Sequence, residues 1–292
     1  MCILYFCQSE IWQPDGYRLI LANNRDEYWD RPTKEADFWA ADKSCISGLD
    51  QMPGREGGTW LGMNSSGKLA VLLNILGQQD PNKLGRGHLV TKFISGSEDI
   101  DQYGTAIHKQ RYSYNGFNLV LFDLGKQEDS LTVKPLYISN AMNYCSCVTK
   151  RNLPANTFFG VSNSPLEYPF QKVEQGRARF GRIVCQYPNV SSRQHLIDNL
   201  MGLMQDQTNL LPDPVLEVVA ASVGFSPLRT GQHSAVNVYS PAQRYGSRTS
   251  SLILVDGEGQ VDYVERNTFF GSDDLPESVD TVHKVFSLGA QT

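Results

Sequence analysis

The sequence predicts an α+β fold in which helices cover antiparallel sheets from the outside. The expected elements come in the order strands, helices, strands, helices, strands, without the regular alternation that parallel βαβ units produce. The chain has 292 residues and 40% of them are apolar, which is enough for a sizeable core. No internal repeat, low-complexity segment or linker interrupts it, so we expect residues 1–292 to form a single domain.

The first half of the chain predicts hairpins followed by helices. Pro14-Asp15-Gly16 separates two runs that are rich in β-branched and aromatic residues, which is typical of a hairpin. A Gly-rich loop then precedes stretches with helical periodicity. The expected elements of this half are strands at 2–7, 17–23, 60–63 and 69–73 and helices at 88–94 and 98–111.

The second half is expected to contain strands, then helices, then strands again. Pro212 and Pro214 indicate a loop, and Asp256-Gly-Glu-Gly259 predicts the turn of a last hairpin. The expected elements of this half are strands at 118–123, 133–138, 157–161, 236–239, 250–255 and 261–266 and helices at 170–186 and 195–205.

Composition and charge exclude several classes of partner. The formal net charge is −5 and no Lys- or Arg-rich run exists to neutralise phosphates, so we expect no nucleic-acid partner. The six cysteines are too sparse for a disulfide scaffold, and the five histidines lack metal-ligand spacing, so we expect no metal site. No apolar stretch reaches about 18 residues, and the N-terminus has no basic region typical of a signal or transit peptide. The sequence therefore predicts a cytoplasmic protein without a transmembrane segment.

One polar stretch stands out because it directly follows an apolar strand. The apolar run over residues 19–22 ends in Asn23 and then Asn24-Arg25-Asp26-Glu27. Two acids and a base at the end of a strand are costly if they are buried and useful if they line a cleft. The alternative is a solvated strand end that feeds a turn.

Matching segments along nearly the whole chain carry a family resemblance. They are Met1-Cys2-Ile3, residues 17–32, 36–39, 47–50, 56–62, 114–119, 162–163, 211–214 and 245–249. In this order they resemble the NRDE-domain family, which is also called the transport-and-Golgi-organisation-two family.

Cys2 has a specific chemical opportunity if Met1 is removed, because its α-amine then becomes the N-terminus. Such an amine has an ordinary pKa of about 8 and can act as general base for the Cys2 thiol, whose thiolate is the nucleophile. This is the logic of N-terminal-nucleophile hydrolases, which the chain resembles. The resemblance implies a four-layer αββα sandwich, which fits the order of elements. The alternative is that Cys2 merely packs at the start of a strand.

The chain is also similar to the choloylglycine hydrolase and penicillin V acylase branch of that class. The resemblance implies that Asp26 binds and orients the α-amine of Cys2. It also implies that Asn74 and Asn163, each at the end of a strand, stabilise an oxyanion. Arg248 is then the arginine that supports the nucleophile or the leaving group.

The chain departs from this branch at one position. The branch has an arginine a few residues before its aspartate, where this chain has Asn23, and Arg25 is adjacent to Asp26 instead. Neighbours in a strand point to opposite faces. We therefore expect that Arg25 and Asp26 do not both face Cys2 unless the strand bends or bulges there.

Two Gly-rich segments indicate a ligand cleft. Trp60 follows Glu56-Gly57-Gly58-Thr59, and Arg86 stands between two glycines just before a helix, where an anion can bind. An ordinary helix entry loop is the alternative for Arg86. The expected ligand-binding residues are Asn24, Arg25, Glu27, Trp60 and Arg86. Aromatic side chains near the motif are expected to line an apolar cavity, with arginines as anchors for anionic groups. These residues are Tyr28, Trp29, Phe38, Trp39 and Trp60, with Arg25, Arg31 and Arg86 as the anchors.

Two functions remain open. The family resemblance implies a carrier for haem, acyl-CoA or another lipid, with roles in Golgi and mitochondrial organisation. Such a carrier requires no cofactor, binds haem or acyl-CoA as its ligand, and can associate peripherally with mitochondrial or ER/Golgi membranes. The alternative is a hydrolase in which Cys2 attacks a linear amide or thioester. For that chemistry we expect Cys2 and Asp26 to share one pocket, with Asn74 and Asn163 pointing into it.

Overall fold

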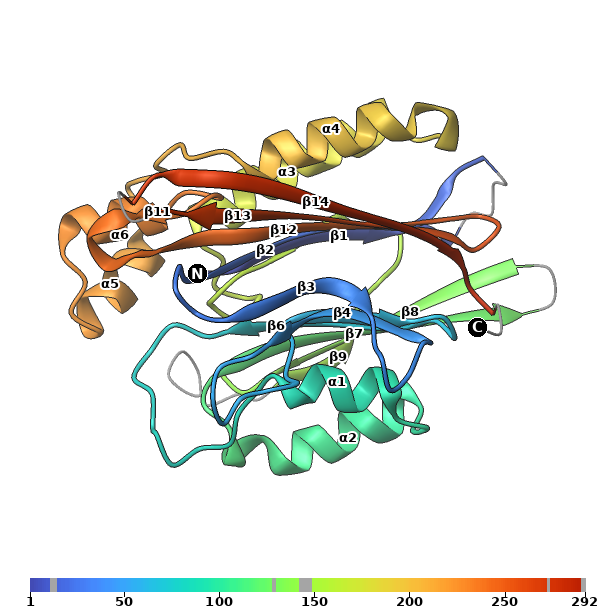
Figure 1. The fold of residues 1–292 in the computed structure, drawn as a ribbon, viewed down its shortest axis with the longest axis horizontal. Helices are drawn as coiled ribbons and strands as arrows, with labels where there is room; N and C mark the ends of the chain where they lie inside the picture. Colours follow the sequence, from blue (N-terminus) through green and yellow to red (C-terminus); the bar gives the residue numbers. More distant parts are fainter. Residues whose placement is uncertain (11–14, 128–129, 142–148, 272–273, 290–292) are drawn as a thin grey trace.

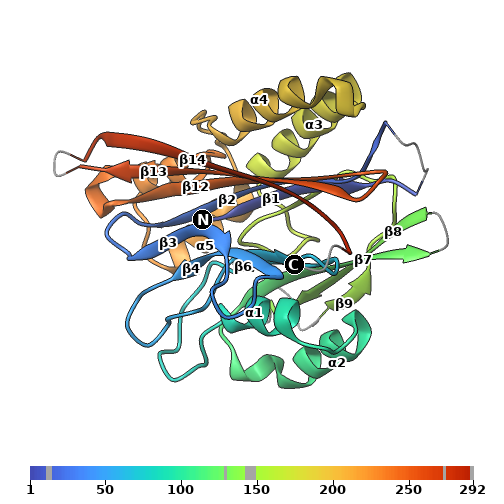
Figure 2. The same cartoon turned by 45° about the vertical axis from the view of Figure 1, so that its right-hand side comes forward.

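The computed structural model of the protein describes residues 1–10, 15–127, 130–141, 149–271 and 274–289. Two sheets stack face to face, and helices cover the outer face of each (Figure 1). The four layers are therefore helix, sheet, sheet and helix, which confirms the expected α+β class and αββα order. The rotated view in Figure 2 keeps the same layers.

The first sheet holds the N-terminal hairpin at its centre. Its strand order is β10-β1-β2-β12-β13-β14, with β11 beside β12. Ile3 lies opposite Asn24 in the antiparallel pair of the first two strands, so the N-terminus reaches the end of the second strand. The strands are β1 Ile3–Gln8, β2 Tyr17–Tyr28, β10 Phe159–Val161, β11 Tyr239–Ser240, β12 Tyr245–Asp256, β13 Gln260–Phe270 and β14 Pro276–Ser287.

The second sheet is a meander in which spatial order follows chain order. Each neighbouring pair is antiparallel, and the connection from β6 to β7 carries the helices of the outer layer. The strands are β3 Thr33–Phe38, β4 Cys45–Asp50, β5 Leu61–Asn64, β6 Lys68–Asn74, β7 Phe117–Gln127, β8 Ser130–Ser139 and β9 Thr149–Asn152.

Two helix pairs form the outer layers. In Figure 1, α1 His88–Ser95 and α2 Ile100–Gln110 lie below the second sheet, and α3 Gln171–Gln186 and α4 Arg193–Met204 lie above the first. Two short helices, α5 Pro214–Ser222 and α6 Pro227–His233, flank one end of the first sheet. Single 3₁₀ turns occur at Arg111–Ser113, Val190–Ser192 and Pro241–Gln243.

The core has three apolar layers, one at each interface between structural layers. Side chains such as Leu21, Phe122 and Ile253 fill the space between the sheets. Phe180 on α3 belongs to the layer between the first sheet and its helices, and Phe93 on α1 to the equivalent layer below the second sheet. Each fully buried side chain of this size contributes roughly 1.5–3 kcal/mol, so the three layers fix the two sheets relative to each other.

Several elements were not expected from the sequence. They are β3, β4, β9, β14, α5 and α6, and the expected strand at 236–239 shortens to β11. Edge strands such as β14 lack the apolar alternation of half-buried strands, because both of their faces are largely exposed. The loop expected at Pro212 and Pro214 contains Pro212 but ends before Pro214. Pro214 is the first residue of α5, and the Asp213 carboxylate caps that helix by accepting from the Leu216 amide at 3.0 Å.

Candidate functional site

The N-terminal hairpin opens into a cavity of about 620 Å³ between the two sheets and their loops. We call this cavity the Cys2 cleft. Its lining includes Cys2, Arg25, Asp26 and Glu27 from the first sheet and Trp60, Asn74 and Arg86 from the second sheet and the loop before α1. A volume of this size is within the ordinary range of small-molecule sites. The structure therefore brings Cys2 and Asp26 together, as the hairpin predicted.

The N-terminal ammonium is a buried charge beside the cleft. Met1 is 4% exposed, and its nitrogen lies 2.8 Å from Asp26 Oδ2 and 2.7 Å from the Tyr245 hydroxyl. The Ser247 hydroxyl donates to Asp26 Oδ1 at 2.5 Å. Burial lowers the pKa of the Met1 ammonium, and the Asp26 carboxylate opposes that shift. Asp26 therefore holds and orients the terminal ammonium of a chain that begins at Met1.

A buried lysine supports the same segment. Lys172 on α3 is fully buried, and its Nζ donates to the carbonyls of Met1 at 3.4 Å and Ala235 at 3.1 Å. Burial lowers the pKa of Lys172. The sequence contained a signal for this residue, because Lys172 shares one helix face with Gly176 and Phe180 at i, i+4 and i+8.

The Cys2 thiol faces the cleft next to Asp26. The Asp26 amide donates to Cys2 Sγ at 3.5 Å, and the Ser162 hydroxyl donates to the Cys2 carbonyl at 2.7 Å. Surrounding protein desolvates the thiol, and this burial raises the pKa of Cys2 although the Met1 ammonium works against it. With Met1 in place the Cys2 nitrogen is an amide and cannot accept a proton. In this form of the chain Cys2 is therefore a neutral thiol without a base of its own.

Arg25 and Asp26 both line the cleft although they are neighbours in β2. The pairing of β2 with β12 shifts register here, since Ser247 lies opposite Asp26 and Thr249 opposite Arg25. Arg248 is thus the extra residue of a β-bulge. The expected exception to strict alternation therefore applies, because a bulge bends the strands where the two charges sit.

The Arg25 guanidinium is buried against an aromatic ring. Arg25 is 5% exposed, and its guanidinium carbon lies 4.2 Å from the centre of the Trp60 ring. Nη1 donates to Thr33 Oγ1 at 3.1 Å, and the Glu27 carboxylate is 4.0 Å from Nη2. Burial lowers the pKa of Arg25. The guanidinium thus has a cation–π contact and only a distant carboxylate, which leaves room for an anion.

The cleft has an excess of positive charge. Its cationic lining residues are Arg25, Arg31, Arg55, Lys83 and Arg86, and its carboxylates are Asp26, Glu27, Asp50 and Asp80. Asp26 pairs with the Met1 ammonium, and Asp50 pairs with Arg31 at 2.6 Å. After these pairs are set aside, four cations face two carboxylates. Burial, followed by the charge of Arg55, lowers the pKa of Arg86 to about 10.

Two of these cations, Arg55 and Lys83, were not singled out from the sequence. Both stand in loops that meet across the second sheet, where Thr59 donates its amide to the Gly87 carbonyl at 3.2 Å. A Cβ on Gly58 would approach Gly87 Cα to 3.2 Å, so the glycines permit this close contact. The positions of Arg55 and Lys83 in the sequence did not reveal that their loops would meet.

The two asparagines lie together but play different parts. Asn74 ends β6 and lines the cleft. Asn163 is 4% exposed, is not part of that lining, and donates its side-chain amide to the Asn74 carbonyl. Asn163 therefore positions the end of β6 in this structure.

Two expected site residues point elsewhere. The Asn24 amide donates to the carbonyls of Met204 at 2.7 Å and Val236 at 3.1 Å, so Asn24 binds the helix layer and does not contact the cleft. Arg248 donates to the carbonyls of Tyr28 at 3.1 Å and Arg31 at 2.6 Å and is also outside the cleft lining. Strand alternation explains Asn24, because it faces away from Arg25.

The expected apolar cavity is wrong. Of the five aromatic residues named for it, only Trp60 lines the cleft. Trp29 stacks on Phe270 with ring centres 4.1 Å apart, and Phe38 packs against Phe286 at 5.5 Å. These rings join β3 and the end of β2 to the last two strands, so they serve the fold.

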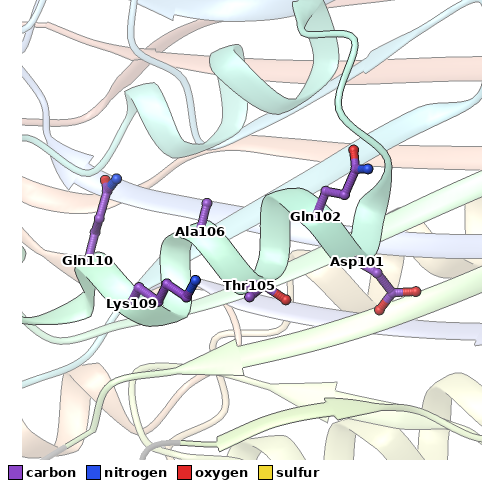
Figure 3. Close-up of a pocket in the computed structure, with 6 residues that line it drawn as sticks. All are labelled: Asp101, Gln102, Thr105, Ala106, Lys109 and Gln110. Atoms are coloured by element: carbon purple, nitrogen blue, oxygen red, sulfur yellow. The ribbon is translucent and has the colours of Figure 1, made fainter.

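A second hollow lies along α2, and its lining shares no residue with the Cys2 cleft (Figure 3). The side chains drawn there come from this one helix and are Asp101, Gln102, Thr105, Ala106, Lys109 and Gln110. Within the described ranges, no group of three or more His, Cys, Asp or Glu side chains is arranged to hold a metal ion. None of the helices described is long and apolar enough to cross a bilayer.

The stacked sheets with helices on both outer faces, and Cys2 beside Asp26 where the first strand begins, define a four-layer αββα protein. A family model described as Transport and Golgi organisation 2 matches residues 1–269. The chain belongs to the Transport and Golgi organisation 2 family.

Relatives in two mammals align over almost their whole length. The chain is 36% identical to the Transport and Golgi organization protein 2 homolog of Bos taurus, covering 94% of this chain and 95% of that protein. It is 37% identical to the Homo sapiens homolog, covering 91% and 93%. A solved Caenorhabditis elegans N-acylethanolamine-hydrolyzing acid amidase ortholog is 9% identical, covers 87% of this chain and 92% of its own, and superposes with a TM-score of 0.45. Likeness at that level carries no information on activity.

Proposed function

We propose that the Cys2 cleft binds an anionic metabolite with an apolar body, and that the protein carries this ligand in the cell. The observation behind the proposal is the charge imbalance of the cleft, in which four cations face two carboxylates once the internal ion pairs are set aside. A buried cation without a close carboxylate is costly, and an anionic ligand offsets that cost.

Acyl-CoA fits this cleft better than haem does. The lining is mostly polar, and its apolar contacts come from Trp60, Leu72 and Leu84. Several phosphates can engage the guanidinium groups of Arg25, Arg55 and Arg86, since planar guanidinium groups bind phosphate oxygens in pairs. Haem presents two carboxylates on a large flat apolar body, for which this lining offers less surface. Haem and lipid homeostasis, and a place at mitochondria or the Golgi, belong to the same proposal.

Titration with a long-chain acyl-CoA and with haem tests the proposal. Arg25→Ala should weaken binding by roughly ten- to a hundredfold, since a charge-assisted contact contributes about 1.5–3 kcal/mol. Arg151→Ala is the matched control, because Arg151 is exposed, pairs with Glu167 and lies outside the cleft. No saturable binding of either ligand by the unmodified protein would contradict the carrier function.

A hydrolase is the second candidate, and the position of Asp26 favours it. The Asp26 carboxylate holds a terminal ammonium beside the Cys2 thiol. If Met1 is removed, the α-amine of Cys2 becomes the base. The thiol proton then passes to that amine, and the thiolate attacks an amide or thioester carbonyl, with Asn74 in the cleft lining as the oxyanion donor. Asn163 supports the end of β6 that carries Asn74, and Arg248 has no part in this step because it lies outside the lining.

Intact mass of the protein from its own cells, combined with Cys2→Ala, separates the two candidates. A retained methionine contradicts the amine-assisted mechanism. If the methionine is absent, Cys2→Ala should abolish turnover on amide and thioester substrates, whereas ligand affinity should change only a few-fold, by about 1 kcal/mol or less. Cys2→Ser is the matched variant, because it keeps the size of the side chain and loses the thiolate.

A further inference from the structure

The strand β14 leaves the edge of the first sheet open. It runs over Pro276–Ser287 and, within the part of the chain that the structure describes, it pairs with β13 alone. Val279 and Val285 are 51% and 52% exposed. Figures 1 and 2 show this strand along the outside of the sheet in both views. A long edge strand with exposed apolar residues is a template for pairing with another strand.

The sequence of β14 is complementary to itself in one antiparallel register. Around a two-fold axis, hydrogen-bonded and non-hydrogen-bonded pairs must alternate, so the axis must pass through a pair of identical residues. An axis at Val282 places Asp280 opposite Lys284 of the second copy, and Val279 opposite Val285. Each of these pairs occurs twice by symmetry, and Val282 meets its own copy at the centre.

The neighbouring registers lack this match. An axis at Thr281 places Asp280 opposite Val282 and Val279 opposite His283. An axis at His283 places Lys284 opposite Val282, and an axis at Asp280 places two Asp280 carboxylates opposite each other. Opposite charges and β-branched pairs stabilise a cross-strand position and like charges destabilise it. The register centred on Val282 is therefore favoured.

We propose that this protein forms a two-fold dimer in which the β14 strands of two copies pair antiparallel around Val282. The first sheets then join into one continuous sheet across the dimer. Lys284 already contacts Asp37 at 3.0 Å in its own chain, and Asp280 of the partner subunit approaches it from the open side. No residue of β14 belongs to the lining of the Cys2 cleft, so dimerisation is independent of the proposed ligand.

Charge reversal tests the pairing. Asp280→Lys places like charges at two symmetric positions and should weaken the dimer by about tenfold or more, measured by analytical ultracentrifugation. Lys284→Asp should do the same, and the double variant Asp280→Lys, Lys284→Asp should restore much of the affinity. Glu277→Lys is the matched control on the same strand, because its opposite residue is the uncharged Ser287. A monomeric unmodified protein at tens of micromolar, or a double variant as weak as the single ones, would overturn the proposal.

Cross-linking tests the register itself. Val282→Cys places two thiols at the two-fold axis. The Cα atoms of facing residues are about 4.5–5.5 Å apart there, which allows the two thiols to form a disulfide. Position 281 lies opposite His283 of the second copy, two residues away from position 281 of that copy. The two thiols of Thr281→Cys therefore do not face each other. Mild oxidation should therefore produce a covalent dimer with Val282→Cys and not with Thr281→Cys. Equal cross-linking of both variants would refute this register, and the melting temperature of each variant checks that it is folded.

Discussion

The two sides of the Cys2 cleft differ in how their buried charges are neutralised. On the N-terminal side, the Met1 ammonium and the Asp26 carboxylate pair at 2.8 Å, and Tyr245 and Ser247 complete their hydrogen bonds. On the opposite side, the Arg25 guanidinium rests on Trp60, and its nearest carboxylate is 4.0 Å away. The charges on the first side are neutralised by each other, whereas the Arg25 guanidinium on the second side needs an anion from outside the protein.

This difference separates residues that hold the fold from residues that hold a ligand. Breaking a satisfied buried pair leaves an uncompensated charge and should destabilise the protein. Removing an unsatisfied cation relieves a desolvation cost, so its loss should appear in ligand affinity and much less in stability.

Asp26→Ala should have the largest effect on stability. It leaves the Met1 ammonium buried without a partner, and breaking a buried ion pair in this way costs about 3–5 kcal/mol. Denaturant unfolding measures the change. Asp206→Ala is the matched control, since Asp206 pairs with Arg179 at 2.7 Å on a half-exposed surface, and its loss should cost about 1 kcal/mol or less. Equal losses for both variants would show that the N-terminal pair is not the stronger one.

Glu265 provides a smaller and opposite test, because it is a buried carboxyl that forms no ion pair within the described part of the chain. It accepts from the Ala36 amide at 2.8 Å and from Asn267 Nδ2 at 3.0 Å, and burial raises its pKa. Glu265→Gln keeps the shape and the acceptor oxygen and removes the cost of ionisation. We expect the variant to be more stable than the unmodified protein at neutral pH.

The pH dependence of that gain has a definite sign. The folded state keeps the Glu265 proton to a higher pH than the unfolded chain does. The stability contributed by the protonated carboxyl is therefore fully present below the unfolded pKa and is lost as the pH rises towards the folded pKa. Melting temperatures of the two proteins should converge at acidic pH and separate at neutral pH. A separation that grows towards acidic pH would contradict this account.

The sequence predicted the proximity of Cys2 and Asp26 because a short hairpin determines it. It also indicated that Arg25 and Asp26 could share a cleft only if the strand bends or bulges, but the bulge that occurs arises from pairing with β12, more than two hundred residues away. Strand alternation predicts that the Asn24 side chain faces away from Arg25. It shows that Asn24 is outside the cleft only once the face of β2 that lines the cleft is known.

The aromatic residues near the motif could not be placed in the same way. Trp29 packs against Phe270 on β13, and Phe38 packs against Phe286 on β14. No sequence pattern predicts β14. Contacts between distant edge strands are set by sheet order, which local periodicity does not contain.

A cycle of two charge removals, one in the protein and one in the ligand, tests the central claim most directly. Calorimetry would compare a long-chain acyl-phosphopantetheine with the acyl-pantetheine that differs from it only in lacking the phosphate, on the unmodified protein and on Arg25→Ala. If Arg25 binds a phosphate, the unmodified protein should prefer the charged ligand by roughly tenfold or more, and Arg25→Ala should lose most of that preference. Equal affinity of the unmodified protein for both ligands, or a preference that survives in Arg25→Ala, would contradict the assignment of Arg25 as the anchor of an anionic ligand.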